Sequence, residues 1–165
     1  NIYAIGDVLG KMMLAHVAME EGIIASENAL GKSAEMNYDI VPRCIYTSPE
    51  IAAVGITEKE AKDKGIQIKI GKFPFTASGK AATIGEREGF VKVISDERNE
   101  IILGLQIVGV CAADLVAEGV LAMKKGVTVK ELASTIHAHP TLSEAVMEAA
   151  LDNLGSAIHM PKKAR

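Results

Sequence analysis

The order of two hydrophobic patterns is the feature that most limits how this chain folds. Three segments in its middle, residues 66–73, 90–94 and 101–110, have the alternating or continuous apolar pattern of strands. After residue 111 the apolar residues recur at helical spacing instead. Strands grouped first and helices grouped afterwards predict an α+β domain, in which helices pack on one face of an antiparallel sheet.

Turn and capping residues set the limits of the predicted elements. A capping box at Thr57 opens one short helix, and a second box at Thr128 opens another. The stretch rich in Gly, Ala and Ser before residue 90 is predicted to be a loop. Strands are predicted at residues 41–46, 51–55, 66–73, 90–94 and 101–110, and helices at residues 57–65, 112–126, 128–136 and 141–154.

The first segment has a different character. Residues 2–5 form a β-branched and aromatic run that stops at Gly6-Asp7, and a helical pattern follows over residues 11–30. A strand that enters a helix through such a turn belongs to an α/β sheet and needs neighbouring strands. We therefore predict that residues 1–35 are an incomplete part of another domain and that residues 36–165 form the α+β domain. The chain is expected to be a fragment of a longer protein.

Composition excludes several classes of function. The chain has 165 residues, of which 48% are hydrophobic, and this is enough for a buried core. Its net charge of -3 leaves no cationic excess for phosphates, so a nucleic acid is not an expected partner. The apolar runs are too short to span a membrane, and no leader pattern for secretion is present. A cytoplasmic location is expected.

The two cysteines do not form a recognisable site. Cys44 and Cys111 stand 67 positions apart, without a CxxC pair and without a nearby histidine. Each has apolar neighbours, which is typical of buried free thiols in a reducing compartment. We predict neither a redox couple nor a metal site at these residues.

The most suggestive motif lies between the last two predicted helices. Pro140 cannot continue a helix, so His139 is expected in a connection, where side chains are free to serve a site. Glu144 is close enough to orient the imidazole and favour its charged form, as a general base requires. The alternative is a capping box in which Thr141 and Glu144 close the helix start, and spacing alone favours it. His137 is expected to be a surface or partly packed residue.

Six segments carry a resemblance to a known family. They are NIYAIGDV (residues 1–8), MLAH (13–16), IYTSPEIAAVG (45–55), GKFPF (71–75), IILGLQIVG (101–109) and IHAHPTLSEA (136–145). In this order, and over nearly the whole chain, they resemble the pyridine nucleotide-disulfide oxidoreductases, specifically the branch that oxidises dihydrolipoamide with NAD. A sister reductase such as glutathione reductase is the alternative.

The resemblance implies a domain assignment and partners. Residues 1–35 would be the return segment of an FAD-binding domain, and residues 36–165 the dimerisation or interface domain. The NAD site and the redox cysteine pair would lie in the missing part, and Cys44 and Cys111 do not match that pair. The parent would be a homodimer that binds FAD and NAD and acts on a lipoyl carrier protein of a 2-oxo acid dehydrogenase complex. By itself, the chain could instead be a dimerisation module without catalysis.

The resemblance also implies roles for single residues. His139 would be the base that takes a thiol proton, and Glu144 would orient it, with both presented to the cysteine pair of the other subunit. Asp7 would bind a ribitol hydroxyl of FAD. A helix start facing the flavin pyrimidine ring would be formed by Met13, Leu14, Ala15 and His16. No metal ligand is implied.

Overall fold

The chain forms two compact units in a computed structural model that describes residues 2–161. The first unit ends at Val41 and the second begins at Pro42, so the division falls six residues after the predicted boundary. The Tyr38 hydroxyl donates a hydrogen bond of 2.7 Å to Glu21 on the first long helix, which ties the intervening residues to the first unit. The assignment of residues 1–35 to an FAD-binding domain stays a prediction.

The second unit is built on one antiparallel sheet. Its order is β1-β2-β5-β4-β3 within the part of the chain that the structure describes. The bounds are β1 (Arg43–Ile45), β2 (Glu50–Gly55), β3 (Ile68–Pro74), β4 (Phe90–Asp96) and β5 (Ile102–Gly109). Each predicted strand from residue 41 onward is confirmed, with its ends at most two residues from the predicted ones. The chain leaves β2 for the far edge at β3 and returns through β4 to place β5 beside β2.

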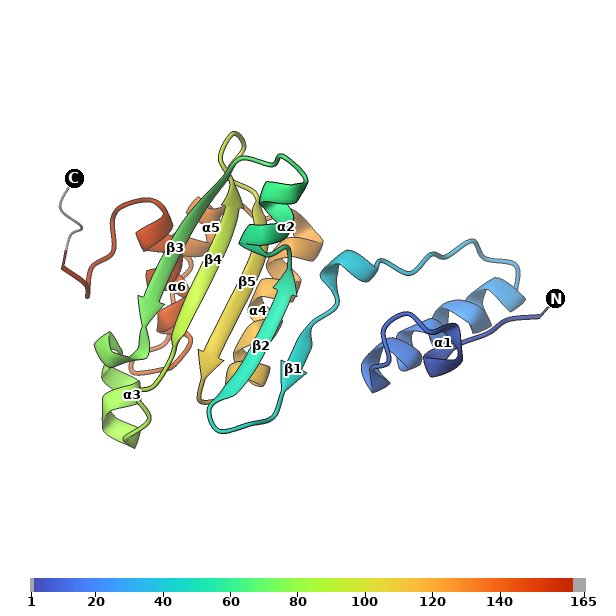
Figure 1. Cartoon of the computed structure of the whole chain (residues 1–165), viewed down its shortest axis with the longest axis horizontal. Coiled ribbons are helices and arrows are strands. Elements are labelled where there is room, and N and C mark those ends of the chain that lie inside the picture. Colours follow the sequence, from blue (N-terminus) through green and yellow to red (C-terminus); the bar gives the residue numbers. More distant parts are fainter. Residues whose placement is uncertain (1, 162–165) are drawn as a thin grey trace. The chain divides into compact units, whose positions relative to one another are not determined.

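Three helices cover one face of this sheet: α4 (Ala112–Lys125), α5 (Val129–Ser134) and α6 (Glu144–Asn153). Figure 1 shows α4, α5 and α6 together behind the strands. The core between the two layers consists of fully buried apolar side chains, among them Phe73, Val91, Val93, Leu105, Ile107, Val116 and Val146. The predicted α+β architecture, an antiparallel sheet with helices packed on one face, is confirmed.

A short helix, α2 (Glu58–Asp63), lies against the opposite face of the sheet (Figure 1). Its Glu58 forms an ion pair with Lys92, which alternates along β4 with the buried Val91 and Val93. Because side chains on a strand alternate between the two faces, Lys92 points away from α4 and α6. The capping box predicted at Thr57 is present: Thr57 Oγ1 accepts the Glu60 N–H, and the Glu60 carboxylate accepts the Thr57 N–H.

The stretch predicted as a loop before β4 contains two short helical segments, and that prediction was wrong in this respect. They are η3 (Phe75–Ala77), which is a 3-10 helix, and α3 (Gly79–Ile84), whose first turn is capped by the Ser78 hydroxyl. A six-residue helix is too short to show a helical apolar period. Phe75 is fully buried, so packing decides the conformation of this segment.

The two last helices are shorter than predicted. α5 ends at Ser134 rather than at residue 136, and α6 begins at Glu144 rather than at residue 141. Pro140 lies between them and cannot donate a backbone hydrogen bond to a helix. The two helices are therefore joined by a nine-residue loop, residues 135–143, which contains His139.

The first unit contains no strand over residues 2–5, so the predicted strand was wrong. The structure shows there an extended segment followed by η1 (Gly6–Leu9), a 3-10 helix, and then α1 (Ala15–Ala29), which begins four residues later than predicted. No other described strand pairs with residues 2–5, and a strand without a partner is not stable. Glu21 of α1 instead accepts the Gly6 N–H at 2.7 Å and holds η1 against the helix.

Within residues 2–161, no helix has both the length and the apolar composition needed to cross a bilayer.

Candidate functional site

The loop between α5 and α6 contains His139. It ends directly before Glu144, whose carboxylate is predicted to contact the His139 ring. Glu144 is the first residue of α6, and the His139–Pro140 peptide bond is cis. The Nδ1 atom of His139 lies 2.8 Å from Oε1 of Glu144. The predicted contact is therefore confirmed as geometry. The catalytic role of the pair stays a prediction.

The Glu144 carboxylate also makes the backbone contact of a capping box. Its Oε2 accepts the Thr141 N–H at 2.8 Å. The Thr141 hydroxyl, however, donates to the Ala138 carbonyl at 2.7 Å, and α6 begins after Ser143 without a side-chain cap. Only half of the predicted capping box is present, so the two alternatives are combined: one oxygen of Glu144 serves His139 and the other serves the loop backbone.

These contacts keep Glu144 ionised. Its partial burial favours the neutral acid, but the Thr141 N–H, the hydrogen bond to His139 and the nearby charges of His139 and His159 outweigh this effect and lower the pKa of Glu144. An ionised carboxylate places a proton on Nδ1 of His139. The Nε2 atom of the neutral ring then carries the lone pair, and the side chain is 79% exposed, so an external acid can reach it.

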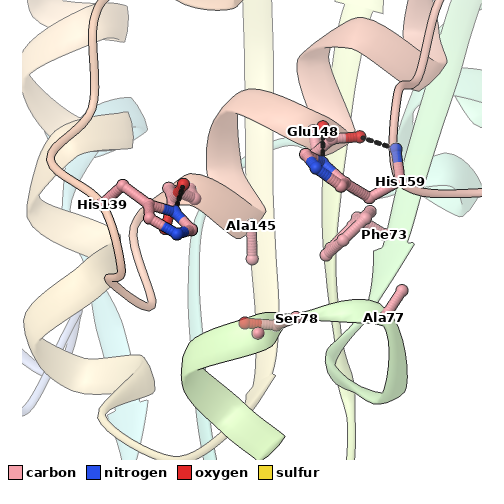
Figure 2. A pocket seen from close by; sticks show the side chains of 9 residues that line it. Phe73, Ala77, Ser78, His139, Ala145, Glu148 and His159 are labelled. Atoms are coloured by element: carbon pink, nitrogen blue, oxygen red, sulfur yellow. Dashed lines mark hydrogen bonds and ion pairs between the residues drawn. The ribbon is translucent and has the colours of Figure 1, made fainter.

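A cavity of about 210 Å³ lies beside the pair. It is lined by Phe73, Ala77, Ser78, Gly79, His139, Glu144, Ala145, Glu148 and His159. Figure 2 shows His139 on one side of this cavity and the contact between Glu148 and His159 on the other. The cavity is thus bounded by the start of α6, the end of β3 and the first turn of α3.

A second histidine–glutamate pair lines the same cavity, and the sequence analysis missed it. Glu148 lies one helical turn after Glu144 and is 1% exposed. Its Oε1 lies 2.7 Å from Nδ1 of His159, and its Oε2 accepts the Ile158 N–H at 3.0 Å. These bonds hold the C-terminal segment against α6. The one available signal was the spacing of four between the two glutamates, which places both on one helix face.

The predicted cofactor residues lie together in the first unit, described here by itself. Asp7 is in the first turn of η1. Leu14 precedes α1 in the N-cap position without a side-chain hydrogen bond, Ala15 and His16 form its first turn, and Met13 is 68% exposed. The first N–H groups of a helix have no partner within the helix. Residues 13–16 thus form the start of α1, and the N-cap residue Leu14 provides no side-chain cap.

The sequence of the second unit identifies its family. The sequence model of the dimerisation domain of pyridine nucleotide-disulphide oxidoreductases matches residues 41–150. The chain belongs to this family. The match covers the whole sheet, α4, α5 and the first part of α6, and it includes His139 and Glu144.

Members of the family that oxidise dihydrolipoamide are highly similar to this chain. It is 51% identical over 160 residues to a dihydrolipoyl dehydrogenase of Thermus scotoductus, covering 97% of this chain and 34% of the relative. A dihydrolipoyl dehydrogenase of Bacillus subtilis is 52% identical over 160 residues, covering 96% and 34%. The chain is homologous to the C-terminal part of these enzymes and spans about a third of their length.

Solved structures of the family share the fold. LpdA from Mycobacterium tuberculosis superposes with a TM-score of 0.85 at 32% identity, over 90% of this chain and 32% of LpdA. The flavoprotein disulfide reductase RclA from Escherichia coli gives a TM-score of 0.80 at 26% identity, over 88% and 34%. The five-stranded antiparallel sheet with its helices is therefore a family property.

The surroundings of Cys44 disfavour the reactive form of its thiol. Cys44 and Cys111 are both free and half-buried. Burial, followed by the nearby charges of Glu50 and Asp114, raises the pKa of the Cys44 thiol, which disfavours the thiolate. Among residues 2–161, no three His, Cys, Asp or Glu side chains gather in a way that could hold a metal ion.

Proposed function

We propose that this chain is the C-terminal part of an FAD-dependent enzyme that oxidises dihydrolipoamide with NAD, and that it supplies the acid–base pair and the dimer interface. The observation that carries the proposal is the 2.8 Å contact between His139 Nδ1 and Glu144 Oε1 on an exposed loop. The identity of about 50% with dihydrolipoyl dehydrogenases supports the choice of substrate.

The pair is suited to thiol–disulfide exchange. A thiol becomes a nucleophile only when it loses its proton, so the reaction needs a base close to the dithiol. His139 accepts this proton at Nε2, and the Glu144 carboxylate stabilises the imidazolium that forms. The disulfide that the thiolate attacks belongs to a part of the enzyme outside this chain. Because the His139 side chain projects into solvent, it can enter the site of a second subunit.

The residues of the first unit fit an FAD group. The Asp7 carboxylate is an acceptor for a ribitol hydroxyl, and the start of α1 at Met13, Leu14, Ala15 and His16 offers the positive end of the helix dipole to the pyrimidine ring. When bound, FAD accepts the electrons of the dithiol and passes them to NAD. Residues 1–35 are accordingly assigned to the return segment of the FAD-binding domain.

The carrier of the substrate and the location of the enzyme are proposed from the same enzyme class. Its substrate is a lipoyl group attached to a carrier protein of a 2-oxo acid dehydrogenase complex, and its location is cytoplasmic. Glutathione reductase is the second candidate, because the same base–carboxylate pair can move the proton of another thiol in thiol–disulfide exchange.

The full-length protein tests the proposal. Purified, it is expected to carry flavin and to reduce NAD with dihydrolipoamide, with kcat/KM at least about 100-fold higher than for glutathione disulfide and NADPH. Visible absorbance spectra and steady-state kinetics measure both properties. A protein that prefers glutathione disulfide would belong to the sister reductases instead.

The 165-residue chain has a function of its own to be tested, that of a dimerisation module. The matched domain is the family's dimerisation domain, and it covers most of the second unit. The purified chain is expected to be a colourless homodimer that buries more than about 1,000 Å² of surface. Light scattering at micromolar concentration measures the mass, and a purely monomeric chain would contradict the prediction. A yellow dimer would show that the chain retains FAD.

A further inference from the structure

The loop that contains His139 is not held by hydrogen bonds between backbone groups. Among the described residues, 136–141 take part in no backbone–backbone hydrogen bond; the nearest are the Thr135 N–H to Leu132 and the Ala145 N–H to Leu142. Ile136 is 97% exposed, so apolar packing does not hold this residue either. The position of His139 therefore depends on side-chain contacts, which are hydrogen bonds and the packing of Leu142 on the core.

The side chain of His137 links this loop to α4 by a hydrogen bond. The ring of His137 is only 6% exposed. Its Nδ1 lies 2.9 Å from the Thr135 carbonyl oxygen, and its Nε2 lies 2.8 Å from Oε1 of Glu118, nineteen residues away on α4. The other hydrogen bonds of the loop, from Thr141 to Ala138 and from Glu144 to Thr141 and His139, stay within the loop and the start of α6.

The anchor point on α4 is rigid. Gly119, next to Glu118, packs so closely on β5 that a Cβ atom there would lie 2.5 Å from Leu105 Cδ2. Leu105 is 1% exposed and belongs to the core. Glu118 is thus fixed to the sheet, and a group bonded to it is fixed as well.

The two partners of the His137 ring are both hydrogen-bond acceptors. A carbonyl oxygen has no proton to donate, and neither has an ionised carboxylate. Through its two nitrogens the ring therefore links the end of α5 to α4.

We propose that His137 is a positioning residue: bonded to Glu118 and to the Thr135 carbonyl, it fixes the loop to α4 and so sets where His139 lies. This role deepens the proposed function and rests on it, because His139 is the group that is positioned. His137 itself contacts neither the cavity nor Glu144.

The NMR signals of the ring nitrogens test the contact directly. In the 165-residue chain, nitrogen-15 NMR resolves the ring nitrogens of the four histidines. Glu118→Gln is expected to shift the Nε2 signal of His137, because it replaces the carboxylate that this nitrogen contacts. Glu97→Gln in the exposed β4–β5 turn leaves the His137 signals unchanged. An unchanged His137 spectrum in the Glu118→Gln chain overturns the proposal.

Kinetics of the full-length enzyme test the positioning role. Both His137→Gln and Glu118→Gln are expected to lower kcat for dihydrolipoamide oxidation about 10-fold, because a misplaced base reacts less often. Oxidation of NADH by a one-electron acceptor needs no thiol base and is expected to stay within about 2-fold. The Glu97→Gln enzyme should behave as the unsubstituted one in both assays, and thermal unfolding shows whether each variant is folded.

The outcomes separate this inference from the proposed function. If His139→Gln lowers dihydrolipoamide oxidation but folded His137→Gln and Glu118→Gln enzymes do not, the positioning role is refuted and the proposed function stands. If His139→Gln has no effect, the proposed function fails, and the positioning role fails with it. A variant that loses both activities equally has lost its fold or its flavin, and then the role of His137 is structural only.

Discussion

Replacing His139 with glutamine is expected to lower kcat for dihydrolipoamide oxidation by at least about 100-fold in the full-length enzyme, which is the usual cost of losing a general base. The glutamine amide keeps a hydrogen bond to Glu144 but cannot accept the thiol proton. Steady-state assays of NAD reduction measure the effect. The reason lies in the geometry: Nδ1 of His139 is held 2.8 Å from Glu144, and its side chain is 79% exposed toward an external substrate.

Two controls make this result specific. Glu144→Gln retains the base but removes the charge that stabilises the imidazolium, so a smaller loss of about 10-fold is expected. In both variants, electron transfer from NADH to a one-electron acceptor should remain near its original rate. If the His139→Gln enzyme oxidises dihydrolipoamide normally, His139 is a loop residue, and the contact with Glu144 serves only the helix start.

The largest expected effect on stability comes from Gly71→Ala. Gly71 lies on β3 where α6 crosses the sheet, and a Cβ atom there would lie 2.0 Å from the Ala149 carbonyl oxygen and 2.3 Å from the Asn153 nitrogen. Both atoms belong to the backbone of α6, so the clash is relieved only if the helix moves. We expect the free energy of unfolding to fall by about 3 kcal/mol. Urea unfolding followed by circular dichroism measures this change.

A matched substitution is available for this experiment. Gly79→Ala lies in the first turn of α3, where a Cβ atom meets nothing within 4 Å and the backbone is helical. Its effect on stability is expected to be below about 1 kcal/mol. Because α6 carries Glu144 and Glu148, the Gly71 variant should also oxidise dihydrolipoamide more slowly. Equal stability of the two alanine variants would show that α6 adjusts without cost.

Much of the second unit could be predicted from local pattern. Apolar residues alternate on β3, β4 and β5 and recur at helical spacing on α4. These periods show which residues face the core, and a few consecutive residues are enough to reveal them. The contact of His139 with Glu144 was also accessible, because they stand five positions apart with a proline between them. The segment of residues 2–5 shows the limit of such reasoning: it has strand composition, but a strand also needs a neighbour.

The amino-acid sequence by itself thus determined the five strands and most helices of the α+β unit, the family and the His139 motif. Each of these is encoded in a stretch of consecutive residues. Tertiary structure alone decided which strands are neighbours, since β2 pairs with β5 across about fifty residues of chain. It also decided the contacts of His137 with Glu118 and of His159 with Glu148. These partners are nineteen and eleven residues apart, and they meet only where α4 and α6 pack on the sheet and their neighbouring loops fold back over them.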